Sequence, residues 1–103
     1  MVSGVNYKDA YLRLKQKCVN DGYKVEEVCD SKTKDYVGMN NLAAGDIGYP
    51  KMEKKTLFVD DWLDYKAKYH TLKHELIEHQ EMGNGKSYWK AHEVALKREK
   101  YGR

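Results

Sequence analysis

The most constraining feature of this chain is a long segment, Asp61 to Met82, that contains neither glycine nor proline and is followed at once by Gly83-Asn84-Gly85. Such a segment predicts a helix that stops at the glycines. Asp60 and Asp61 stand at its start, where a carboxylate can cap the first turn. Apolar side chains fall on both faces of this helix, with Trp62, Tyr65, Tyr69, Leu72 and Leu76 on one and Leu63, Ala67 and Ile77 on the other. We expect other elements to cover it on both sides.

A second helix is predicted after the glycines, with Ser87 as its cap and an end near Lys100. One of its faces is narrow and carries mainly small side chains, namely Tyr88, Ala91, His92, Ala95 and Glu99. Small residues at a contact let two helices approach closely. Because the connection is short, the two helices are predicted to form an antiparallel hairpin.

The first part of the chain predicts a helix and a strand. A stripe of apolar residues at spacings of three and four indicates a helix from Asn6 to Asp21, with Asn6 as its cap and Gly22 at its end. The segment Tyr23 to Cys29 is typical of a strand, and Asp30 to Lys34 is typical of a turn.

The middle of the chain is rich in loop-forming residues. Tyr36 to Pro50 holds three glycines, two consecutive asparagines and the single proline, which predicts a long loop with one short strand. Lys55 to Val59 is β-branched and aromatic and gives the clearest strand prediction. The whole pattern predicts one α+β domain over residues 1–103, in which an N-terminal helix and a small β-sheet pack on a C-terminal helical hairpin. Residues 1–53 supply a helix, a strand and the loop, and residues 54–103 supply a strand and the hairpin.

Charge and hydropathy exclude several classes of protein. The 19 basic and 16 acidic residues give a net charge of +3 and are interleaved, so we do not expect a nucleic-acid partner. A nucleic-acid-binding protein that uses the basic tail Lys97 to Arg103 and exposed tyrosines stays open as a rival interpretation. No run of about 18 apolar residues is present, and Met1 to Asn6 lacks the apolar core of a signal peptide. These features predict a cytoplasmic protein without a membrane partner. Cys18 and Cys29 match no redox or zinc motif and are expected to be free thiols that are buried or partly buried.

The histidines are unusually clustered, since all four lie between positions 70 and 92. His74 and Glu78 are one helical turn apart, and His92 is at the same height on the second helix of the predicted hairpin. These three side chains can bind one Zn²⁺ and leave a fourth position open for water, as in catalytic zinc sites. Glu75 is displaced by about 100° around the helix, where it can accept a proton from that water without binding the metal.

Two other interpretations of the same residues stay open. In one, His92 hydrogen-bonds to Glu78 or Tyr88 in a polar network that contains no metal. In the other, the residues hold a structural metal, and the chain is a small non-catalytic protein-binding module of phage or mobile-element origin. A ligand set of His70, His74 and Glu78 is disfavoured, because three such positions on one helix spread over about 12 Å.

Three motifs of the second half are Leu57-Phe58-Val59-Asp60, His74-Glu75-Leu76-Ile77-Glu78 and Tyr88-Trp89-Lys90-Ala91-His92-Glu93-Val94-Ala95. In this order they resemble the minimal zincin-like metallopeptidases of small archaeal, bacterial and phage proteins, over about residues 55–99. The resemblance implies that His74 is a ligand, Glu75 the general base, Glu78 a ligand where most zincins have histidine, and His92 a later ligand. It also implies an edge strand beside the motif helix, for which residues 54–59 and the segment Leu42 to Ile47 are candidates.

The residues and the resemblance together predict a zinc-dependent, peptidase-like hydrolase that acts on a peptide or protein substrate. The open loop at residues 38–53 is the segment expected to select that substrate.

Overall fold

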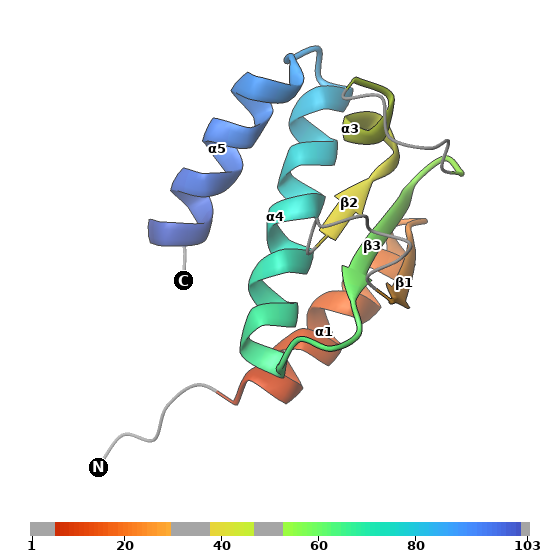
Figure 1. The fold of residues 1–103 in the computed structure, drawn as a ribbon, viewed down its shortest axis with the longest axis vertical. Helices are drawn as coiled ribbons and strands as arrows, with labels where there is room; N and C mark the ends of the chain where they lie inside the picture. Colours follow the sequence, from red (N-terminus) through yellow and green to blue (C-terminus); the bar gives the residue numbers. More distant parts are fainter. Residues whose placement is uncertain (1–5, 30–37, 47–52, 102–103) are drawn as a thin grey trace.

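The computed structural model describes residues 6–29, 38–46 and 53–101 (Figure 1). The elements, in chain order, are α1 (Tyr7–Asn20), β1 (Lys24–Val28), β2 (Gly38–Asn40), α3 (Asn41–Asp46), β3 (Thr56–Asp60), α4 (Tyr65–Gly83) and α5 (Tyr88–Tyr101). The protein thus has the predicted mixed α+β fold, with its two C-terminal helices packed together. The predicted turn at Asp30 to Lys34 lies outside the described residues.

Helix α1 begins and ends where the sequence predicts. The side chain of Asn6 accepts a hydrogen bond from the Asp9 backbone N–H at 3.1 Å, which caps the first turn. After the helix, Gly22 adopts a φ of +89°, a conformation that glycine adopts without strain. The chain can then turn back so that the Tyr23 N–H donates to the Cys18 carbonyl. This return leads directly into β1.

Strand β3 lies in the middle of the sheet that the described residues form, in the order β1-β3-β2. It pairs in parallel with β1, with Val25 opposite Leu57, and antiparallel with β2, with Met39 opposite Phe58. Leu57 and Val59 on one face of the strand and Thr56 and Asp60 on the other are all buried, as expected for a central strand covered on both sides. Residues 54–59 are therefore not an edge strand, and that expectation was wrong.

Of the loop predicted at Tyr36 to Pro50, the structure describes residues 38–46, and the rest lies outside the described residues. The predicted short strand exists as β2, but it is followed by a helix, α3, that was not predicted, so the candidate edge segment at Leu42 to Ile47 is helical over its described part. The edge strand beside the long helix is instead β2. Asn40 explains the start of α3, because its side-chain oxygen accepts the Ala43 backbone N–H at 2.8 Å in the manner of a helix cap.

Helix α4 begins later than predicted. Its cap is Asp64, whose carboxylate accepts the Ala67 N–H at 2.8 Å, whereas Asp60 ends β3 and accepts the indole N–H of Trp62 at 3.0 Å. Trp62 thus precedes the helix and is largely exposed. The predicted end of α4 at the glycines is confirmed, with Asn84 as the C-cap.

Other elements cover α4 on both sides, as its two apolar faces predicted (Figure 1). On one side α1 and the sheet close a core that contains Tyr11, Cys18, Tyr23, Leu57, Val59, Leu72 and Leu76. On the other side α5 packs through fully buried Ala91 and Ala95. No helix in the described ranges is long and apolar enough to cross a membrane.

Candidate metal centre

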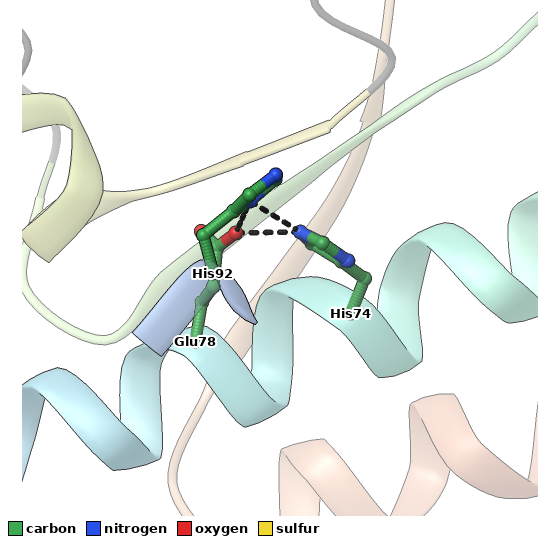
Figure 2. A group of neighbouring side chains, drawn as sticks. All are labelled: His74, Glu78 and His92. Carbon is green, nitrogen blue, oxygen red and sulfur yellow. Dashed lines mark hydrogen bonds and ion pairs between the residues drawn. The ribbon is translucent and has the colours of Figure 1, made fainter. Parts of the chain in front are cut away.

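The three predicted ligands meet between α4 and α5. Figure 2 shows the carboxylate of Glu78 and the imidazole of His74, both from α4, directed at the ring of His92 from α5. The Glu78 Oε2 atom lies 2.5 Å from both His74 Nε2 and His92 Nδ1, and these two nitrogens are 3.2 Å apart. Among the described residues, this is the one group of three His, Cys, Asp or Glu side chains that could hold a metal ion. Its three ligand atoms all lie within 4.8 Å of one another.

The sequence brings these residues together through the hairpin geometry. His74 and Glu78 share one face of α4 because they are one turn apart. The Ser87 hydroxyl caps the start of α5 by accepting the Lys90 N–H at 3.3 Å. Because the helix starts at this point, His92 lies on the face of α5 that is turned toward α4. Buried Ala91 and Ala95 then allow the close approach that the site requires.

Glu78 carries the charge of the site. Only 2% of its side chain is exposed, and burial alone would raise its pKa. The hydrogen bonds and charges of His74 and His92 outweigh this effect and hold the pKa of Glu78 below its ordinary value. The site therefore contains a buried, ionised carboxylate that faces two imidazole nitrogens.

The residues fit a zinc ion. Tetrahedral zinc sites hold their ligand atoms about 2.0–2.2 Å from the ion, which places those atoms about 3.3 Å apart. The 3.2 Å between the histidine nitrogens matches this spacing, and the Glu78 oxygen needs to retreat from each nitrogen by less than about 1 Å. Two histidines and a glutamate are also an established ligand set of catalytic zinc sites.

The same distances fit the metal-free network, in which both ring nitrogens carry a proton and donate it to Glu78. The ring of Tyr88 stacks on that of His92, with centroids 5.5 Å apart, and supports the position of this imidazole in both cases. The two interpretations differ in whether the nitrogens present lone pairs to a metal ion or N–H protons to the carboxylate.

The predicted base, Glu75, lies beside this cluster and is joined to it by Asn40, a residue that no sequence motif predicts. The side-chain amide of Asn40 donates to Glu75 Oε1 at 2.8 Å and to Glu78 Oε1 at 3.3 Å. In the sequence the consecutive asparagines predict a loop, and nothing local indicates that the first of them faces α4. Only the pairing of β2 with β3 places it there.

The other two histidines are not part of the centre. His79 is buried on the side of the core, where its Nδ1 lies 3.0 Å from the Tyr23 hydroxyl and burial lowers its pKa. His70 packs against the rings of Tyr7 and Tyr69, so the alternative ligand set that included it is not assembled.

Comparisons with known proteins add no further constraint: no protein-family model, no curated protein and no solved structure matches this chain. The geometry of the site is thus the ground for any functional proposal.

Proposed function

We propose that this chain is a zinc-dependent, peptidase-like hydrolase with His74, Glu78 and His92 as the metal ligands and Glu75 as the general base. The observation that carries the proposal is the convergence of one carboxylate oxygen and two imidazole nitrogens, from two helices, on a single point. Three protein ligands leave the fourth tetrahedral position free for water, as catalysis requires.

The proposed chemistry divides between the metal and the chain. Zinc held by His74, Glu78 and His92 would lower the pKa of a water bound to it to about 7. Glu75 stands one residue after His74, and the Asn40 amide donates to both Glu75 and Glu78. This places the Glu75 carboxylate beside the ligands, where it can accept a proton. This division assigns binding to three residues and proton transfer to a fourth.

Solvent reaches the centre mainly at α5. The His92 side chain is 32% exposed, whereas those of His74 and Glu78 are largely covered. Next to it, Trp89 is 70% exposed and its ring lies 4.9 Å from that of Tyr88. A peptide would approach from this side, where an exposed aromatic surface adjoins the most accessible ligand.

The exposed tryptophans favour a second candidate, a non-catalytic protein-binding module in which the cluster holds a structural metal or only a polar network. Trp62 and Trp89 both present more than half of their surface to solvent. Large exposed aromatic residues are typical of binding hot spots.

A single substitution separates the two candidates. We would incubate the zinc-loaded protein with a mixture of unstructured peptides and follow cleavage by mass spectrometry. Glu75→Gln is expected to retain zinc but to abolish cleavage, because an amide cannot accept the proton. Glu93→Gln, an exposed position on α5, serves as the matched control and is expected to leave cleavage unchanged. Absence of cleavage by the wild type, or cleavage that survives Glu75→Gln, would contradict the proposal.

A further inference from the structure

Asn40 occupies a position that neither the sequence pattern nor the proposed ligand set explains. It ends β2, is fully buried, and uses both halves of its side-chain amide. The oxygen accepts the Ala43 N–H at 2.8 Å, and the nitrogen donates to Glu75 at 2.8 Å and to Glu78 at 3.3 Å. One short side chain thus connects the start of α3 to the two carboxylates of the proposed site.

Gly38 permits this contact. Residues 38 and 40 share one face of β2, because side chains alternate along a strand. A Cβ atom at Gly38 would lie 2.5 Å from Thr71 Cγ2 and 3.1 Å from Glu75 Cγ, so only glycine lets β2 lie this close to α4. The close approach brings the asparagine amide within reach of both glutamates.

The chemistry of an amide suits this place. Two buried carboxylates side by side repel each other, and a shared hydrogen-bond donor reduces that cost. A lysine or arginine would do the same but would add a positive charge, which opposes the binding of a cation. The asparagine side chain donates hydrogen bonds through its NH₂ group, carries no charge, and leaves the negative charge of the site unchanged.

We infer that Asn40 is a positioning residue of the proposed zinc site. It holds Glu78 Oε1 so that Oε2 faces the two histidines, and it holds Glu75 beside them. Partners of this kind, which orient metal ligands without binding the metal, typically change metal affinity 10- to 100-fold when removed. The inference rests on the proposed function, because it assumes that Glu78 binds zinc.

Asn40→Ser tests the role without disturbing the start of α3. A serine hydroxyl can still cap the helix by accepting the Ala43 N–H, but it is too short to reach both carboxylates. The matched control is Asn41→Ser, because the Asn41 side chain bonds to the Thr56 N–H of β3 at 3.3 Å and not to the two glutamates of α4. If Asn40→Ser does not fold, Asn40→Thr retains the hydroxyl and more of the side-chain volume and carries the same test.

The measurements are zinc affinity by competition with a chromophoric chelator and the visible absorption of bound Co²⁺. Asn40→Ser is expected to weaken zinc binding by about 10- to 100-fold and to alter the Co²⁺ spectrum. Asn41→Ser is expected to keep the zinc affinity within about twofold of the wild type and to leave the Co²⁺ spectrum unchanged. A folded Asn40→Ser protein with wild-type affinity and spectrum would overturn the positioning role and leave the zinc site standing. A wild type that binds neither metal would overturn the zinc site and this inference together.

Discussion

At the scale of single residues, Glu78 determines what the space between α4 and α5 can hold. It is the only acidic ligand of the candidate set, and its Oε2 atom contacts both imidazoles at 2.5 Å. Because the histidines keep its pKa low despite burial, it remains anionic at neutral pH. A buried anion with two imidazole neighbours is suited to a divalent cation.

Gly38 gives a prediction at the same scale. Gly38→Ala forces a Cβ against Thr71 and Glu75 and is expected to lower the free energy of unfolding by about 1–3 kcal/mol, as overpacking does. Gly83→Ala is the control, because a Cβ at this last residue of α4 would meet nothing within 4 Å. Alanine also has a higher helix propensity than glycine, so no loss of stability is expected. Urea denaturation measures the free energy of unfolding of the two variants. Equal stability of the two variants would show that β2 does not lie as close to α4 as described.

At the scale of elements, Glu27 ties three of them together. From β1 it accepts hydrogen bonds from Tyr11 of α1 at 3.0 Å and from Lys68 of α4 at 2.6 Å. Burial alone would raise its pKa, but these bonds outweigh burial and keep the pKa of Glu27 below its ordinary value. A carboxyl whose pKa is lower in the folded state stabilises the protein at neutral pH and loses that effect as the pH falls through the folded-state pKa.

Glu27→Gln is therefore expected to reduce the free energy of unfolding by about 1 kcal/mol at pH 7 and by much less at about pH 2. Its neighbour Glu26 pairs at 3.8 Å with exposed Lys24, so Glu26→Gln should change stability by less than about 0.5 kcal/mol at both pH values. Denaturant titrations at the two pH values make the comparison. If Glu27→Gln lowers the free energy of unfolding equally at pH 7 and at about pH 2, the pKa argument is contradicted.

The elements also show what the sequence could predict. Local signals placed α1, the end of α4 and the start of α5, because Asn6, the glycines and Ser87 act on their own neighbours. The predicted start of α4 was wrong because Asp60, Asp61 and Asp64 can each cap a helix, and the burial of Asp60 at the end of β3 is not visible in the sequence. Helix α3, with six residues, is too short to show a periodic pattern.

The site was predictable to the extent that it lies on one hairpin. Helical spacing relates His74 to Glu78, and counting from the turn relates both to His92. Asn40 was not predictable, because it comes from a strand that precedes Glu75 by 35 residues, and its place depends on sheet pairing. Contacts of this kind have no signature in a local pattern.

At the scale of the whole molecule, α4 is the element around which the others assemble. It contacts α1, α3, α5, β2 and β3, and the candidate centre draws its residues from β2, α4 and α5 (Figure 1). Binding a metal there would connect segments from both halves of the chain. It should therefore stabilise the folded state as a whole.

Cys18 reports on that global stability. It lies fully buried in the core, and burial raises the pKa of its thiol to about 11, so it reacts only when the protein opens. In a Cys29→Ser background, which removes the exposed thiol, zinc at ten times its dissociation constant should slow alkylation of Cys18 about tenfold. Adding His74→Ala should abolish the effect of zinc. A labelling rate that does not respond to zinc would indicate that the folded state does not bind it.

The most direct test of the central claim is the zinc content of the purified protein, measured by elemental mass spectrometry after preparation without chelator. We predict about one zinc per chain in the wild type and in His70→Ala, whose side chain packs against Tyr7 and Tyr69 outside the cluster. We predict none in His74→Ala or His92→Ala. A wild type that holds no zinc even after incubation with the metal would contradict the account and would identify the cluster as a metal-free polar network.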